Sequence, residues 1–107
     1  MSKKTYKVST SRVARLKLKK QFDYIAFDQQ EPILAIKWLD GIESSILSLS
    51  QFPERCALAP ENQGNNANSK PILRHFIYKK SFRIIFTIVK NEVIILTVKH
   101  SAKQVVH

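Results

Sequence analysis

Two nearly continuous apolar runs near the end of the chain constrain its fold most strongly. They read FRIIFTIV (82–89) and EVIILTVKH (92–100), and only a short polar break at Lys90-Asn91 separates them. Their β-branched and aromatic residues favour strands, and a break this short joins two strands into an antiparallel hairpin. Because the runs are not cleanly alternating, we predict that the hairpin is central and that the sheet is covered on one face.

Two further strands are expected upstream of this hairpin. The stretch PILRHFIY (71–78) is strand-favouring and ends at the polar residues 79–81. With the hairpin it predicts a meander of three antiparallel strands. Near the start of the chain, in TYKVSTS (5–11), Tyr6, Val8 and Thr10 alternate with polar neighbours, and this pattern predicts a short first strand.

Two amphipathic helices are predicted between the first strand and the meander. The first runs from Arg12 to about Asp28, and Ser9–Ser11 offers its N-cap. The second begins near Pro32, which suits a first helical turn, and ends at Pro53. Gly41 inside it costs on the order of 1 kcal/mol relative to alanine, so we expect a close approach by the first helix. The positions expected to be buried are Ala14, Leu18, Phe22 and Ile25, then Ala35, Leu39, Ile42, Ile46 and Leu49, with Trp38 flanking the second set.

The predicted order is therefore β-α-α-β-β-β. The sheet is the apolar surface against which the helical hairpin can bury its stripe, so the fold class is α+β with two layers. A length of 107 residues fits one domain, 1–107. The polar segment 53–71 is predicted to be a long loop, mobile around Gly64–Asn68. Such a loop is either functional or a tolerated surface insertion.

The charge of the chain is strongly positive and unevenly distributed. The formal net charge is +10, basic residues dominate 1–20 and 51–107, and the acids gather in 21–50. A field of this sign attracts polyanions, which include nucleic acid, an acidic membrane surface and an acidic protein. Charge alone does not choose among these partners.

Several classes of protein are excluded or disfavoured by what the sequence lacks. Cys56 is the only cysteine, and no metal-type cluster surrounds it, which fits a reducing cytoplasm. The basic N-terminus has no apolar core of a signal peptide, and no run reaches the roughly 20 apolar residues of a membrane span. Gly41 and Gly64 are too few for a glycine-rich phosphate cradle. We therefore expect no metal, no cofactor and no membrane partner.

Cationic side chains near the strand ends are the remaining candidates for function. Together with Lys103 further on, they could bind a target or its phosphates while His100, or Tyr78 in reserve, moves a proton, as a metal-free ribonuclease requires. The alternative is that they are solvated strand ends, the usual state of Lys and Arg. His75, in mid-strand, is expected to be a packed or surface residue. The candidates for target or phosphate binding are Arg74, Lys79, Arg83, Lys99, His100 and Lys103.

From about Tyr6 to Lys103, the chain resembles the RelE/ParE toxin superfamily. The resemblance rests on the order of elements and on short motifs at fixed places along the chain. These motifs are Phe52-Pro53-Glu54 after the second helix, Arg74 at the start of the second strand, Phe82-Arg83 and then Phe86 in the third, and Val98 and His100 closing the fourth.

The resemblance implies the toxin of a bacterial type II toxin–antitoxin pair. Its partner would be an acidic antitoxin whose C-terminal segment wraps the helices and the sheet. RelE-like members are ribosome-dependent endoribonucleases that cut mRNA. ParE-like members, which include plasmid stabilisation toxins, poison DNA gyrase and lack the nuclease residues.

This sequence departs from the ribonuclease pattern in two places. Tyr78 and Lys79 stand where RelE-like enzymes carry an arginine, and the last stretch, SAKQVVH, keeps Lys103 but has no arginine or tyrosine. Lysine is a point charge and does not replace a bidentate arginine. These departures favour a ParE-like gyrase inhibitor, although the same stretch also lacks the arginine pairs common there. His100 leaves open a RelE-like nuclease with ribosome and mRNA as partners, and the missing arginines leave open a non-toxic binding module.

Overall fold

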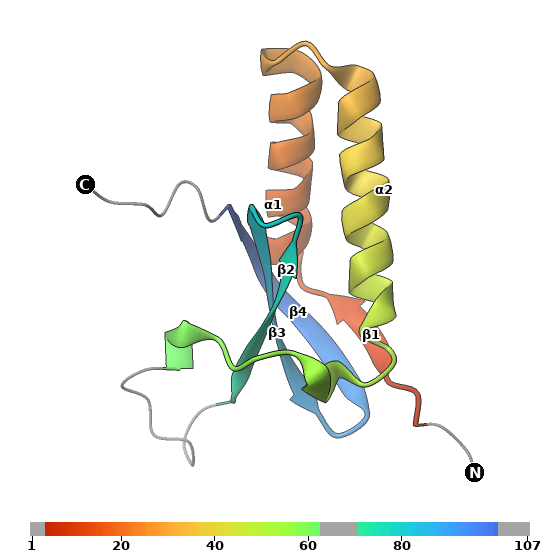
Figure 1. Ribbon diagram of the computed structural model, residues 1–107, viewed down its shortest axis with the longest axis vertical. Coiled ribbons are helices and arrows are strands. Elements are labelled where there is room, and N and C mark those ends of the chain that lie inside the picture. The colour runs from red at the N-terminus through yellow and green to blue at the C-terminus, as the bar shows by residue number, and fades with distance from the viewer. Residues whose placement is uncertain (1–3, 63–70, 101–107) are drawn as a thin grey trace.

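The predicted order of helices and strands is confirmed by the computed structural model, which describes residues 4–62 and 71–100 (Figure 1). The predicted mobile tip at Gly64–Asn68 and the candidate Lys103 lie outside the described residues. The elements are β1 (Lys7–Thr10), α1 (Arg12–Asp23), the π-helical turn η1 (Tyr24–Asp28), α2 (Pro32–Ser48), the 3₁₀ turns η2 (Pro53–Arg55) and η3 (Pro60–Asn62), β2 (Leu73–Tyr78), β3 (Phe82–Val89) and β4 (Glu92–His100).

The strands form one sheet with the order β1-β4-β3-β2. The predicted antiparallel meander of β2, β3 and β4 is confirmed, and β1 joins parallel to β4. The turn between β2 and β3 places Lys79 and Lys80 at positive φ, 51° and 64°. Two positive φ angles are typical of the type I′ turn, whose twist matches that of a two-stranded hairpin.

Helix α1 begins where β1 meets an irregularity in β4. The side-chain oxygen of Ser11 accepts the N–H of Ala14 at 3.1 Å and so caps the helix, as predicted. The same hydroxyl donates to the carbonyl of Leu96 at 2.9 Å. Leu96 lies at a bulge in β4, because the consecutive β3 residues Ile85 and Phe86 pair with Thr97 and Ile95 and skip Leu96. Ser11 therefore fixes the start of the helical hairpin to the bulged strand.

The helical hairpin stands beside the sheet, with α1 and α2 side by side (Figure 1), and shares one core with it. On α1, Ala14 and Leu18 are buried as predicted, while Phe22 is partly buried. On α2, Trp38 is 6% exposed and Leu39 only partly buried, so the predicted places of these two are exchanged. The indole packs edge-on against Phe82 of β3, with ring centroids 5.2 Å apart. That aromatic contact draws Trp38 to the centre of the stripe.

Gly41 is required by the sheet and not, as predicted, by the first helix. A Cβ at this position would overlap the hydroxyl oxygen of Tyr78 and lie 3.0 Å from its Cζ. Tyr78 closes β2, is 7% exposed and donates its hydroxyl toward the carbonyl of Trp38 at 3.4 Å. The close approach is therefore made by a tyrosine ring end from the sheet.

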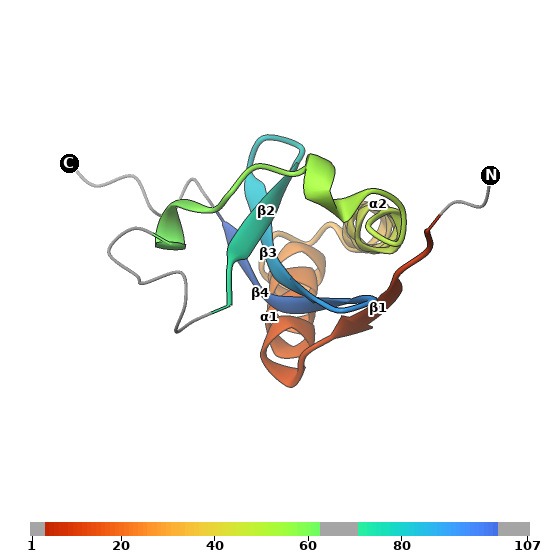
Figure 2. The same cartoon turned by 90° about the horizontal axis from the view of Figure 1, so that it is seen from below.

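The first part of segment 53–71 is more ordered than the loop that was predicted. Leu58 bridges to Arg74, the Ala59 N–H donates to the Leu73 carbonyl at 2.9 Å, and the His75 N–H donates to the Ala57 carbonyl at 3.1 Å. The segment runs beside β2 (Figure 2). Because β2 is an edge strand, its unpaired backbone groups need partners, and this segment supplies them.

Candidate functional site

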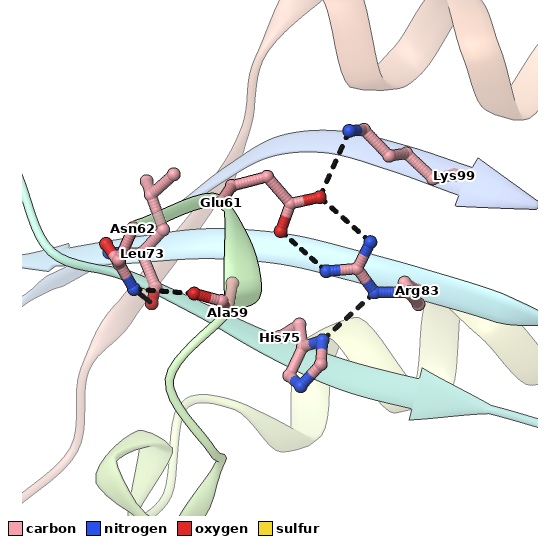
Figure 3. Close-up of polar contacts among 7 residues, drawn as sticks. All are labelled: Ala59, Glu61, Asn62, Leu73, His75, Arg83 and Lys99. Atoms are coloured by element: carbon pink, nitrogen blue, oxygen red, sulfur yellow. Dashed lines mark hydrogen bonds and ion pairs between the residues drawn. The ribbon is translucent and has the colours of Figure 1, made fainter. Parts of the chain in front are cut away.

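Two of the predicted cations meet on the sheet and share a carboxylate. Arg83 on β3 and Lys99 on β4 are cross-strand partners. Arg83 holds Glu61 with two hydrogen bonds of 2.6 and 2.9 Å, and the Lys99 Nζ lies 3.1 Å from the same carboxylate (Figure 3). Two like charges directly opposite each other destabilise a sheet. Glu61, which comes from η3, offsets that repulsion.

His75 completes this cluster from β2. The Arg83 Nε donates to the His75 Nδ1 at 3.0 Å, so the imidazole acts as an acceptor (Figure 3). Burial, and then the charge of Arg83, lower the pKa of His75 below its usual range. A neutral imidazole is the form that can accept this bond. All of the Arg83 guanidinium nitrogens are thus engaged within the chain, and the residue is 7% exposed.

The carboxyl group of Glu61 is held in its charged form. The hydrogen bonds from Arg83 are the largest cause, and they lower the pKa of Glu61 from 4.5 to about 2. Sequence reasoning did not identify this residue. Its signal was present, because Glu61 is the only acid between Glu54 and Glu92 in a strongly basic half of the chain.

The depressed pKa makes part of the stability depend on acid pH. A carboxyl group whose pKa is lower in the folded than in the unfolded protein stabilises the fold at pH values above its unfolded pKa. For Glu61 this stabilisation is lost as the pH falls from 4.5 toward about 2. We expect the free energy of unfolding of wild type to exceed that of Glu61→Gln by on the order of 1–2 kcal/mol at pH 6, after discounting for solvent screening. Denaturant titrations from pH 6 to pH 2 should show that this difference shrinks. A difference independent of pH would contradict the ion pair.

The other predicted site residues do not join this cluster. Arg74 donates to the carbonyls of Cys56 at 2.7 Å and Glu54 at 3.2 Å, so it fastens the segment beside β2. Lys79 is exposed in the β2–β3 turn, with its ammonium 5.7 Å from the centroid of the Tyr78 ring. Tyr78 itself is in the core, where its hydroxyl points at α2.

A groove of about 610 Å³ lies between the end of α1 and the end of β4. Its floor includes Phe82 and Val98, and His100 stacks on Phe82 with ring centroids 4.5 Å apart. Phe27, which is 69% exposed, adds an apolar wall. The charged and polar lining consists of Lys17, Lys20, Gln21, Asp23, Asp28 and Lys99, and Tyr24 completes it. The groove therefore combines aromatic surface with a rim of mixed charge, in which three lysines stand beside two aspartates.

Among residues 4–62 and 71–100, no group of His, Cys, Asp and Glu has the geometry of a metal site. In the same part of the chain, no helix is long and apolar enough to cross a membrane. The candidate sites are thus a buried ion cluster on the sheet and an aromatic groove of mixed charge at its side.

Together these features define a small basic α+β domain that carries a buried ion cluster on its sheet and an open aromatic groove beside it. The family model "ParE toxin of type II toxin-antitoxin system, parDE" matches residues 8–105, so the chain belongs to this toxin family. Membership in a toxin–antitoxin family implies that an antitoxin is its partner. The predicted superfamily is thereby confirmed.

The fold has a counterpart among solved structures. A structure described as "Chromosomal ParDE TA system from P. aeruginosa" superposes with a TM-score of 0.68 at 19% sequence identity. The match covers 90% of this chain and 96% of that chain. At this identity the likeness supports the fold. A search of curated proteins found no match to this sequence.

Proposed function

We propose that this toxin inhibits DNA gyrase, as a ParE-like plasmid stabilisation toxin of the cytoplasm, and that an acidic antitoxin neutralises it. The observation that carries the proposal is the state of Arg83. A metal-free nuclease needs several cations free to surround one phosphate and a group to move the proton. Arg83 is instead buried against Glu61 and His75. A surface that recognises gyrase needs no such constellation.

The ribonuclease alternative has less support from the residues that would carry it. Tyr78 is buried under α2 and Arg74 is engaged with loop carbonyls. His100 stacks against Phe82 beside the groove, and it is the remaining candidate for the proton-transfer residue of a nuclease. The experiment that decides between the two targets therefore includes a variant at His100.

The target can be tested with the purified protein in two reactions. One is a gyrase supercoiling reaction, scored for loss of supercoils and for trapped, cleaved plasmid. The other is cleavage of mRNA on programmed ribosomes. We expect inhibition in the first and intact mRNA in the second. Cleaved mRNA that disappears in His100→Ala, with gyrase unaffected, would make the protein a RelE-like nuclease.

A non-toxic binding module is the remaining alternative. Expression of the protein without an antitoxin distinguishes such a module from a toxin. We expect arrested growth of the bacterial host. Normal growth, together with soluble and folded protein in the same cells, would favour the binding module.

The acidic character of the antitoxin is supported by the net charge of +10 and by the lysines that line the groove. In an acidic antitoxin segment, apolar side chains would pack on Phe82, Val98 and Phe27, and carboxylates would pair with the lysines of the groove. Opposite charges steer association, and salt screens them over about 10 Å at 0.1 M ionic strength.

We expect the association rate with the antitoxin to fall by about tenfold or more between low salt and physiological salt. Stopped-flow mixing of toxin and antitoxin at several salt concentrations measures this rate. As a matched comparison, Lys20→Gln on the groove rim should flatten the salt dependence more than Lys37→Gln on α2. A rate independent of salt would show that charge does not guide this encounter.

A further inference from the structure

We propose that the toxin, when no antitoxin is bound, self-associates through its helical hairpin, so that α1 of each copy packs against α2 of the other. The inference goes beyond inhibition of gyrase and does not depend on it. The partner is a second copy of this chain, because the outer faces of α1 and α2 both carry apolar side chains and carry charges of opposite sign. The same contact would occur twice around a two-fold axis.

The side of α2 that turns away from the core is more apolar than a solvent-facing helix requires. Ile33, Ile36 and Leu47 are 70%, 53% and 65% exposed. Their spacings of three and eleven residues set them on one face of the helix, and Asp40 and Glu43 lie between them on that face. Since the outer face of a surface helix is usually polar, exposed aliphatic side chains gathered in this way favour an interaction surface.

The outer side of α1 is basic. Arg12, Leu16 and Lys19 are all exposed and follow one another at helical spacings, on the side opposite the buried Ala14 and Leu18. α1 contains five lysine or arginine residues and one aspartate, whereas α2 contains two acids and one lysine. The hairpin therefore joins a positive helix to a weakly negative one, and each helix is the electrostatic complement of the other.

The side chains also match in their position along the hairpin. α1 continued by η1 spans residues 12–28 and α2 spans 32–48, so the two arms have equal length and run antiparallel, side by side (Figure 1). A two-fold axis parallel to them sets α1 of one copy along α2 of the other. Lys19 then lies level with Asp40, and Leu16 lies within about one helical turn of Leu47.

The charges on the two faces are available for such a contact. Asp40 and Glu43 take part in no ion pair among residues 4–62 and 71–100. Lys19 pairs with Asp23 at 2.8 Å, but an exposed pair of this kind is worth little, so Lys19 can also meet a carboxylate of a second copy. Two copies of net charge +10 repel each other at long range, and salt screens this repulsion over about 8 Å at physiological ionic strength. We therefore expect a weak, reversible dimer.

The contact is separate from the groove beside β4. Arg12, Leu16 and Lys19 do not line that groove, and α2 contributes no residue to its lining. Each copy in the dimer would therefore keep its groove for the antitoxin.

The test is sedimentation velocity of the purified full chain, without antitoxin, over a range of protein concentrations at physiological salt. We expect wild type to shift reversibly from monomer to dimer as concentration rises. Lys19→Glu and Asp40→Lys each place like charges at the contact and should weaken dimerisation at least about tenfold. The double variant Lys19→Glu/Asp40→Lys restores opposite charges and should dimerise again. Lys90→Glu, in the β3–β4 turn, is the matched control because it changes the net charge as Lys19→Glu does.

A second pair of variants tests the apolar part of the contact. Leu47→Gln should weaken dimerisation by about tenfold or more, since a leucine buried in the dimer is lost. Leu34→Gln, on another face of α2 and 51% exposed, should dimerise like wild type. The substituted side chains are exposed, so the variants should fold, and circular dichroism checks this. A wild type that stays monomeric, or a double charge reversal that does not regain the dimer, would overturn the proposal. If wild type is monomeric and Leu47→Gln no longer binds the antitoxin, this face belongs to the antitoxin instead.

Discussion

Ile95→Ala is expected to lower the free energy of unfolding by about 2–5 kcal/mol, as large-to-small changes at fully buried sites do. Ile95 lies in β4 and is 0% exposed. It pairs with Phe86 on one side and with Thr10 on the other. The cavity left by its side chain would open where both neighbouring strands and α1 meet, and the bulge at Leu96 limits how far β4 can shift to close it.

The matched control is Ile77→Ala, which removes the same atoms from a strand residue that is 47% exposed. Its effect should stay within about 1 kcal/mol, since changes at exposed positions are usually small. Chemical denaturation of the three proteins measures both differences. Equal losses in the two variants would mean that the buried face of the sheet is assigned wrongly. Leu39→Ala should fall between them because Leu39 is only partly buried.

The sheet and the helical hairpin could be predicted because their signals are local and repeated. The runs at 82–89 and 92–100 contain so many strand-favouring residues that no competing structure is plausible, and their polar break is short. The cap at Ser11 and the start at Pro32 are likewise decided within a few residues of each helix end. The long loop was the weakest part, because polar composition does not reveal that an edge strand nearby needs backbone partners.

The candidate site could be predicted only in part, because its contacts join distant parts of the chain. Arg83 and Lys99 were identified from the sequence as candidates for binding a target or its phosphates, with solvated strand ends as the alternative, and neither interpretation included an internal ion pair. The carboxylate that buries Arg83 comes from 22 residues earlier in the chain. Similarly, the exchange of Trp38 and Leu39 follows from an aromatic contact with Phe82, 44 positions away, which helical periodicity does not encode.

Gly41→Ala is expected to lower the free energy of unfolding by about 1–3 kcal/mol, the usual cost of overpacking a core. In an exposed helix the same change would stabilise by about 1 kcal/mol, so the expected sign is the reverse of the helix propensity. The reason is the Tyr78 hydroxyl, which occupies the space that a Cβ would take. Tyr78 is buried between α2 and Phe82 and has little room to withdraw. Ser44→Ala, on an exposed face of α2, controls for propensity and should be neutral or slightly stabilising.

A double-mutant cycle with Tyr78→Phe isolates this contact. Phenylalanine removes the oxygen that meets the new Cβ and leaves the ring in place, so Gly41→Ala should cost less in that background. We expect a coupling of about 1 kcal/mol or more, as is typical of residues in direct contact. It would be incomplete, because the Cζ would still lie 3.0 Å from the Cβ. Denaturant midpoints and slopes of the four proteins give the coupling. If the two changes were additive, the glycine would be required by something other than the tyrosine, and the packing of α2 on β2 described above would be wrong.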